Sequence, residues 1–328
     1  MSDVENLVGK RVTVRHRLAD GSATDVVGRV VEAGPHGVTV ERRDGSEVAV
    51  AADRVVALKV VPPRPARSRR AHDVAVDELV RVTSRGWPAP DVEQLGEWEL
   101  RAAGSFTGRA NSVAVVGEPG LPPADAVAQV LAFYAARGLP PQAQVVVGSD
   151  WERRFLDAGW VPKVGYRGGA VVQVADLVDA PGSDLRVDVA AAASDLWLSR
   201  YGRVDDAAAA RAVLEGPRTV GFAELEDDGV PAAAVGRVVV TGEWAGIAAV
   251  ETLPDHRRRG LADAVVRTCL TWAHERGATR VYLQTMPHNT AALALYEPYG
   301  FVTHHEYRYL EPSQEAHSRS SGAHSAGA

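Results

Sequence analysis

The chain has 328 residues, of which 46% are hydrophobic and 24% charged, a composition typical of a soluble globular protein with two or three domains. Its formal net charge of -6 does not favour nucleic acid as the main partner. The single cysteine, Cys269, excludes an intramolecular disulfide and a cysteine-based zinc site, and no residue spacing suggests another metal site. The chain opens without an apolar signal core and has no stretch near the roughly 20 apolar residues of a membrane span, so we expect a cytoplasmic protein.

Short alternating apolar and polar runs fill residues 8–61 and predict about five strands. Glycine-containing turns at 19–21, 34–37 and 43–46 separate them. So many short strands in so little chain favour a small all-β barrel of SH3-like type, which we assign to residues 1–63. A basic, proline-rich stretch, PPRPARSRR, runs from residue 62 to residue 70, and we assign the linker to residues 64–72.

Two mixed α/β segments follow, at residues 73–180 and 184–311, and residues 312–328 have the composition of a disordered tail. In the first segment we expect helices near 74–83 and 124–137 and a strand near 98–102. Residues 133–139 are weakly similar to residues 295–301, which suggests a duplicated module. The predicted fold class is therefore α/β (α+β), with tandem modules built on mixed sheets behind the small barrel.

The stretch PDHRRRGLA, residues 254–262, lies between an apolar strand at 245–253 and a helix that starts at Leu261. Apolar residues at i, i+4 spacing mark the buried face of that helix, which ends at Arg276-Gly277. The first turn of a helix has unpaired N–H groups, and a glycine lets a ligand approach them closely. The arginines add bidentate phosphate contacts. This loop can therefore hold a diphosphate, although on these residues alone a solvated basic loop is an equal alternative.

A second motif follows a strand predicted at 279–286: Asn289, then Tyr296, then Gly300-Phe301. Together the two motifs resemble the GNAT N-acetyltransferase superfamily, whose members carry Pro-x-x-Arg-x-x-Gly-x-Gly/Ala before a helix and Asn-x-x-Ala-x-x-Leu-Tyr-x-x-x-Gly-Phe after the next strand. Residues 98–112 look like the N-terminal half of tandem GNAT proteins. A barrel followed by two such modules resembles the actinobacterial histone-acetyltransferase-like family.

The resemblance implies acetyl-CoA as cosubstrate, with its diphosphate on the amides of the 258–262 loop and its pantetheine arm paired with a strand that splays from its neighbour. Ala262 stands where many members have glycine. The first module lacks a phosphate loop, so we expect it to complete the acceptor cleft without binding acetyl-CoA. The residues expected to bind the cosubstrate are Val250, Thr252, Arg257, Arg258, Arg259, Gly260, Leu261, Ala262 and Asn289.

Tyr296 matches the superfamily's general acid, since a phenol of pKa ~10 can protonate a leaving thiolate whose acid has a pKa of ~8.5. The alternative is a core tyrosine. Asn289 is expected to cap the helix of Tyr296. Glu251, on the splayed strand, is the candidate general base, and the alternative is that it faces solvent. Weaker candidates are Glu243, His256, which we expect to face solvent, and His304 with His305, which we expect at the surface.

The resulting hypothesis is an N-acetyltransferase in which a primary amine attacks acetyl-CoA directly in a ternary complex. The acceptor is a protein lysine or a small amine, and we expect loops such as 199–206 and 225–231 to recognise it. The sequence contains no motif that identifies the acceptor or the oligomeric state. The alternative from another class is a regulatory protein that senses acetyl-CoA without consuming it. In that alternative the barrel and linker contact peptide or nucleic acid, and we expect no membrane partner in either case.

Overall fold

The computed structural model describes residues 7–18, 20–42, 46–60, 70–165, 168–178 and 182–313. The chain divides into two compact units, Met1–Ser68 and Arg69–Ala328. Most of the predicted linker, all but two residues of the predicted tail, and parts of two predicted turns (residues 19 and 43–45) lie outside the described residues. Among the described residues, no helix has both the length and the apolarity needed to cross a membrane.

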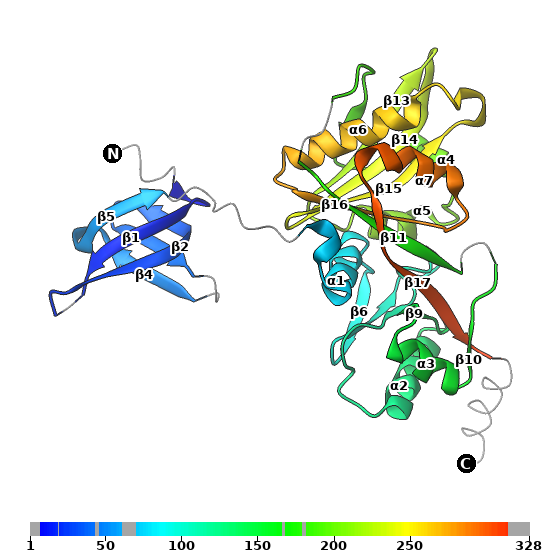
Figure 1. Cartoon of the computed structure of the whole chain (residues 1–328), viewed down its shortest axis with the longest axis horizontal. Coiled ribbons are helices and arrows are strands. Elements are labelled where there is room, and N and C mark those ends of the chain that lie inside the picture. Colours follow the sequence, from blue (N-terminus) through cyan, green and yellow to red (C-terminus); the bar gives the residue numbers. More distant parts are fainter. Residues whose placement is uncertain are drawn as a thin grey trace. The chain divides into compact units, whose positions relative to one another are not determined.

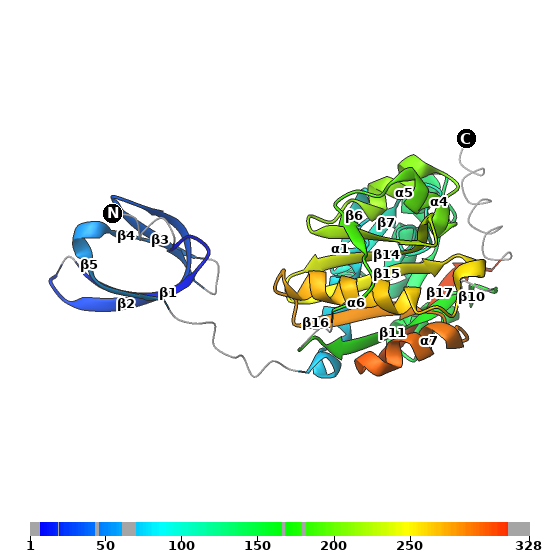
Figure 2. The same ribbon diagram turned by 90° about the horizontal axis from the view of Figure 1, so that it is seen from above.

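The first unit is the all-β domain expected from the alternating runs. Its strands β1 (Arg11–Arg17), β2 (Ala23–Gly34), β3 (Gly37–Glu41), β4 (Glu47–Ala51) and β5 (Val55–Val60) form one antiparallel sheet in the order β4-β3-β2-β1-β5. The sheet curves around a small core, visible end-on in Figure 2. That core consists of valines, whose branched side chains suit the pleated surface of a sheet: Val12, Val14, Val26, Val30, Val38, Val40 and Val50.

The second unit is mixed α/β (Figure 1). Its predicted helices and strands are present, with ends displaced by a few residues at most. The helices are α1 (Val76–Gly86), α2 (Pro123–Ala136), α3 (Asp150–Asp157), α4 (Asp195–Tyr201), α5 (Ala207–Leu214), α6 (Leu261–His274) and α7 (Thr290–Tyr296). The strands are β6 (Asp91–Leu95), β7 (Trp98–Ala102), β8 (Val113–Ala114), β9 (Ala143–Val146), β10 (Trp160–Pro162), β11 (Gly169–Asp176), β12 (Asp188–Ala190), β13 (Val220–Asp227), β14 (Val230–Thr241), β15 (Trp244–Thr252), β16 (Arg280–Thr285) and β17 (Val302–Pro312).

These strands form one continuous sheet in the order β12-β13-β14-β15-β16-β11-β17-β9-β8-β7-β6, and β10 pairs with β17. The strand β11 belongs to the first of the two predicted segments, yet it pairs antiparallel with both β16 and β17 of the second. The strand β17 in turn pairs with β9 of the first segment. The two segments therefore share a sheet and exchange strands instead of building a sheet each, and their predicted boundary at 180–184 stays a prediction.

Helices cover both faces of the part formed by β13, β14 and β15 (Figure 2). Helices α6 and α7 pack on one face, in a core we call the α6-side core, which includes Leu261, Val265, Cys269 and Tyr296. Helices α4 and α5 pack on the other face, in the α4-side core, which includes Trp197 and Tyr201. Side chains alternate between these cores along β13, so that Phe222 joins the α4 side and Ala223 the α6 side.

Candidate active site

The strands β15 and β16 separate in the middle of the sheet. They pair in parallel from Trp244 to Ile247, which lies opposite Leu283. Beyond this point β15 continues to Thr252, and no other described strand pairs with it on that side. The five residues 248–252 are all half-buried, whereas the four before them are buried. The structure thus contains the splayed strand that the resemblance implied, with an open backbone edge along residues 248–252.

A β-bulge on the other side of β15 shapes this open segment. Val235 of β14 lies opposite Glu251 and Arg237 lies opposite Ala248, so two residues of β15, Ala249 and Val250, face Gly236 alone. Ala249 adopts a φ of 54°, an uncommon value for a residue other than glycine. The bulge re-aims the strand, since Ala249 packs on the α4-side core while Val250 packs on the α6-side core.

Gly236, opposite the bulge, yields a prediction about stability. A Cβ at this position would lie 2.5 Å from Cγ1 of Val265, which is fully buried in α6. We therefore expect Gly236→Ala to lower the free energy of unfolding by about 1–3 kcal/mol through overpacking. Urea denaturation followed by tryptophan fluorescence measures this, because all 7 tryptophans lie in the second unit.

The control is Gly182→Ala, since a Cβ there meets nothing within 4 Å. An unchanged unfolding midpoint in the Gly236 variant would show that the bulge and α6 are not packed as tightly as the structure has them.

The loop between β15 and α6 presents unpaired amides. Gly260, with a φ of 79°, precedes the first helical residue, and Ala264 N donates to its carbonyl over 3.0 Å as the first bond of the helix. The amides of residues 261–263 therefore have no intrahelical acceptor. A Cβ on Gly260 would meet no atom within 4 Å, so the space in front of these amides is open.

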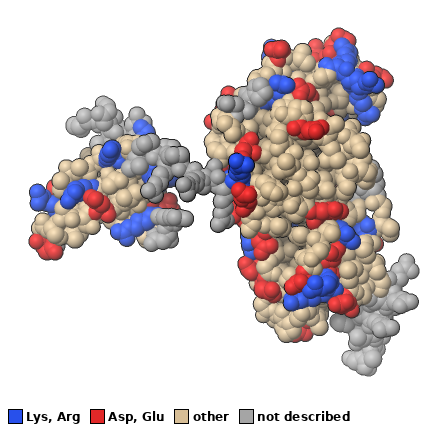
Figure 3. Space-filling model, viewed as in Figure 1, with Lys and Arg blue, Asp and Glu red and all other residues tan. Residues whose placement is uncertain are grey.

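The hairpin between β13 and β14 holds this loop through two carboxylates. Arg259 forms ion pairs of 2.8 Å with both Asp227 and Asp228, and His256 Nδ1 lies 2.7 Å from Oδ2 of Asp227. Figure 3 shows basic side chains with acidic neighbours at the end of the larger unit that carries β13 and α6. The expectation that His256 faces solvent is wrong, because its side chain is only 13% exposed.

The other two arginines of the loop are less constrained. Arg257 Nε donates to the carbonyl of Thr252 over 3.3 Å and so connects the loop to the end of β15. Arg258 has a φ of 62°, and among the described residues its side chain has no ion-pair partner. Of the three arginines, Arg259 therefore anchors the loop, while Arg257 and Arg258 remain exposed beside the open amides.

Tyr296 and Asn289 lie at the two ends of α7. Asn289 Oδ1 accepts a hydrogen bond from the amide of Ala292 over 3.2 Å, which confirms its predicted capping role. Tyr296 is 6% exposed and packs in the α6-side core beside Phe301. Burial, and then the nearby Cys269 and Glu251, raise the pKa of the Tyr296 phenol, so it stays protonated at neutral pH. Tyr296 is therefore a core tyrosine whose hydroxyl stays protonated.

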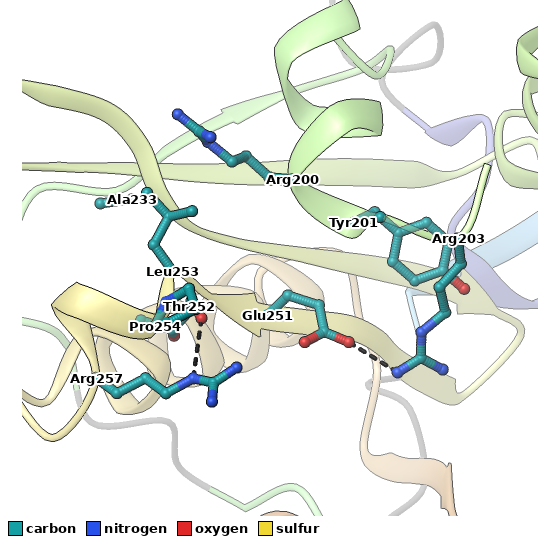
Figure 4. Close-up of a pocket in the computed structure, with 10 residues that line it drawn as sticks. Arg200, Tyr201, Arg203, Ala233, Glu251, Thr252, Leu253, Pro254 and Arg257 are labelled. Carbon is teal, nitrogen blue, oxygen red and sulfur yellow. Dashed lines mark hydrogen bonds and ion pairs between the residues drawn. The ribbon is translucent and has the colours of Figure 1, made fainter. Parts of the chain in front are cut away.

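Glu251 lies on the opposite face of β15 and lines a pocket of about 360 Å³ below the end of α4 (Figure 4). Its Oε1 accepts from Arg203 Nη2 over 2.8 Å, and its side chain is 32% exposed. It is therefore held over the pocket instead of extending freely into solvent. The pocket residues are Arg200, Tyr201, Gly202, Arg203, Ala233, Glu251, Thr252, Leu253, Pro254 and Arg257.

The remaining candidate bases are elsewhere. Glu243 precedes β15, at the end away from the splay, and is 63% exposed. His304 and His305 are half-buried, so the expected surface pair is wrong: His304 Nε2 donates to the carbonyl of Val74 over 2.8 Å. Burial and the charge of His304 lower the pKa of His305 to about 4. Burial raises the pKa of the Cys269 thiol to about 12, so Cys269 acts as a small apolar residue of the α6-side core.

The first module packs beside the splayed strand, and one of its residues there, Trp87, was not singled out from the sequence. Trp87 and Phe106 stack with ring centroids 6.1 Å apart and share the α4-side core with Tyr201, against which Ala248 and Ala249 pack. Trp87 Nε1 donates to Oγ1 of Thr107 over 3.0 Å. The 98–112 segment therefore reaches the same face of the splayed strand as Glu251.

The comparisons with known proteins agree with this geometry. Residues 75–310 match the family profile described as "Probable histone acetyltransferase Rv0428c C-terminal", and residues 6–59 match "Rv0428c N-terminal Sm-like domain". The "Probable histone acetyltransferase Rv0428c" of Mycobacterium tuberculosis is 30% identical over 316 residues, 94% of this chain and 96% of the relative. The chain belongs to the Rv0428c family of GNAT N-acetyltransferases.

Two further similarities support the family and the fold. The "Uncharacterized N-acetyltransferase YobR" of Bacillus subtilis is 26% identical over 247 residues, 71% of this chain and 98% of the relative. A solved "GCN5-related N-acetyltransferase from Kribbella flavida" shares the fold with a TM-score of 0.55 and 19% identity, over 72% of this chain and 95% of that one. This member of the GNAT family is thus an enzyme of acetyltransferase type, and a sensor without turnover is not favoured.

The family profile corrects one prediction about the N-terminal unit. It describes residues 6–59 as Sm-like, where the strand pattern alone had favoured an SH3-like barrel. Both are small β domains, so the number and order of short strands did not distinguish them.

Proposed function

We propose that this GNAT N-acetyltransferase transfers the acetyl group of acetyl-CoA directly to a primary amine in a ternary complex. The observation that carries the proposal is the separation of β15 from β16 between Glu251 on one face and Tyr296 on the other. An open strand edge can accept a pantetheine arm as an added strand, and a free N–H there can polarise the thioester carbonyl.

The loop before α6 supplies the second part of the cosubstrate site. The amides from Arg258 to Ala262 suit a diphosphate, since those of Leu261 and Ala262 have no intrahelical acceptor and a helix N-terminus favours anions. The exposed guanidinium groups of Arg257 and Arg258 favour an anion as well. Val250 and Thr252 on the open strand and Asn289 at the start of α7 complete the set of residues that we propose to contact acetyl-CoA. Arg259 acts through Asp227 and Asp228, by holding the loop in place.

The proposed chemical step uses Glu251 on one face of β15 and Tyr296 on the other. The amine nitrogen attacks the thioester carbonyl carbon, a C–N bond forms, and the C–S bond breaks. Glu251 accepts the proton that the amine loses, directly or through a water, and the Tyr296 hydroxyl gives its proton to the departing thiolate. Burial raises the pKa of Tyr296, so the phenol carries its proton at neutral pH, but the same shift makes it a weaker acid toward the thiolate.

Glu251→Gln tests the base. We expect kcat/KM to fall by about 100-fold near neutral pH, since general-base catalysis contributes about 10² to 10⁴. The defect should shrink as the pH rises toward the pKa of the acceptor amine, ~10.4 for a lysine side chain, because more of the amine is then already deprotonated in solution. A pH profile of both enzymes measures this. A loss that stays constant across the profile would assign Glu251 a structural role instead.

Calorimetric titration with acetyl-CoA tests the binding site. We expect one acetyl-CoA per chain, because only the second module carries the phosphate loop. Two sites per chain would show that the first module also binds, and no binding would contradict the proposed function.

The acceptor class proposed here is a primary amine, on a small molecule or a protein lysine, and the name of the M. tuberculosis relative points to histones. The Sm-like domain has no assigned role in the reaction, and contact with peptide or nucleic acid stays a prediction, as does a cytoplasmic location.

A further inference from the structure

We propose that the natural acceptor is a small amine that carries a carboxylate next to the amine, as a free α-amino acid does. This inference rests on the proposed function, because it assigns the acceptor to the pocket at Glu251. It follows from the charge of the pocket, from the ion pair inside it and from two buried polar atoms that lack partners.

The pocket is more basic than a site for a cationic substrate should be. Its lining includes three guanidinium groups, those of Arg200, Arg203 and Arg257, and one carboxylate, that of Glu251. Two of the arginines flank Tyr201 at the end of α4, and Figure 4 shows Arg203 turned toward Glu251 and Arg200 turned away from it. With Arg257 assigned to the diphosphate, two guanidinium groups still face one carboxylate. A polyamine, an aminoglycoside or a lysine-rich tail would add positive charge to a lining that is already net positive and be repelled.

The ion pair between Arg203 and Glu251 is complementary to a zwitterion. Its two charged groups lie 2.8 Å apart, and their side chains are 37% and 32% exposed. An ion pair so accessible to water adds little to stability, so a ligand can open it at small cost. An α-amino acid carries its ammonium and carboxylate on one carbon. It can place the ammonium against Glu251, where the reaction needs it, and the carboxylate against Arg203.

Two buried polar atoms of the pocket residues have no hydrogen-bond partner among the described residues. These atoms are Nε of Arg200 and Oγ1 of Thr252. A buried donor or acceptor without a partner costs about 1–3 kcal/mol, so such atoms mark places where a ligand gains by supplying the missing partner. Both atoms are closed off from solvent in the structure, so an acceptor reaches them only after the Arg200 side chain turns, and Arg203 is the group already placed to receive the carboxylate.

The test compares acetylation of L-α-amino acids with acetylation of the corresponding carboxamides, which keep the amine and lose only the carboxylate. Free thiol release and mass spectrometry of the acetylated product are measured for the full chain. A lysine-rich histone tail peptide serves as the competing acceptor. The variants are Arg203→Gln, Arg203→Lys and the control Arg186→Gln, which removes an 88% exposed arginine outside the pocket.

We expect wild type to prefer at least one acid over its amide by about 10- to 100-fold in kcat/KM, the worth of a charge-assisted hydrogen bond. Arg203→Gln should abolish that preference by raising the KM for the acid, with the KM for acetyl-CoA unchanged. Arg203→Lys should retain part of the preference, and Arg186→Gln all of it.

Equal rates with acids and amides, or transfer to the histone peptide alone, would overturn the proposal while leaving the acetyltransferase intact. A raised KM for acetyl-CoA in Arg203→Gln would also overturn it, because the arginine would then serve the cosubstrate. Acetyl-CoA that neither binds nor loses its acetyl group to any acceptor contradicts the proposed function itself.

Discussion

Replacing Tyr296 with phenylalanine is expected to lower kcat about 100-fold while leaving the affinity for acetyl-CoA unchanged. The variant keeps the ring that packs beside Phe301 and removes only the hydroxyl, for which the described residues supply no hydrogen-bond partner. Loss of a general acid typically costs 10² to 10⁴ in rate. Steady-state kinetics at saturating acetyl-CoA, together with calorimetric titration, separate the rate from the binding.

The matched control for this variant is Tyr134→Phe. Tyr134 is fully buried in the core of the first module, where its hydroxyl donates to the carbonyl of Arg101 over 3.1 Å. Its loss should reduce stability without changing kcat. If Tyr296→Phe kept the wild-type kcat, its hydroxyl would have no part in the reaction and Tyr296 would be a core residue only.

Replacing Gly260 with alanine is expected to weaken acetyl-CoA binding by about 10- to 100-fold. The left-handed φ of 79° strains any residue with a Cβ, and the methyl group would occupy the open space in front of the helix amides. A hydrogen bond to a charged group contributes about 1.5–3 kcal/mol, so losing one such contact to a diphosphate explains a change of this size. Calorimetry with acetyl-CoA and with desulfo-CoA measures it.

Gly277→Ala controls for the strain. Gly277 follows the same helix at its other end, has a φ of 87° and also faces open space. Both variants should lose about 1–2 kcal/mol of stability from the left-handed backbone, but only the Gly260 variant should lose affinity. Equal affinities in the two variants would place the diphosphate away from the 258–262 loop.

The predictions that succeeded were local. The strand, loop and helix around residues 254–262 follow from apolar periodicity interrupted by Pro254 and Gly260, and the cap at Asn289 follows from its side chain alone. Such features depend on neighbours within about two helical turns, so a single sequence contains the information that determines them.

The features that the sequence did not predict depend on contacts between residues far apart in the chain. Nothing in the sequence of β11 marks it for insertion between β16 and β17, because an apolar strand suits many sheet positions equally. The ion pairs of Arg259 with Asp227 and Asp228 join residues about 30 positions apart in the sequence, and no local pattern predicts such a pairing. The bulge in β15 could not be predicted from the sequence, because the residue with the positive φ is Ala249 and not a glycine.

The most direct test of acetyl transfer at the splayed strand is free thiol release from acetyl-CoA by the wild-type protein across a panel of amines. The account predicts release that depends on the amine, with one acetylated product molecule for each thiol released. Stoichiometric binding of acetyl-CoA with no release by any amino acid, amine or lysine peptide of the panel would contradict it.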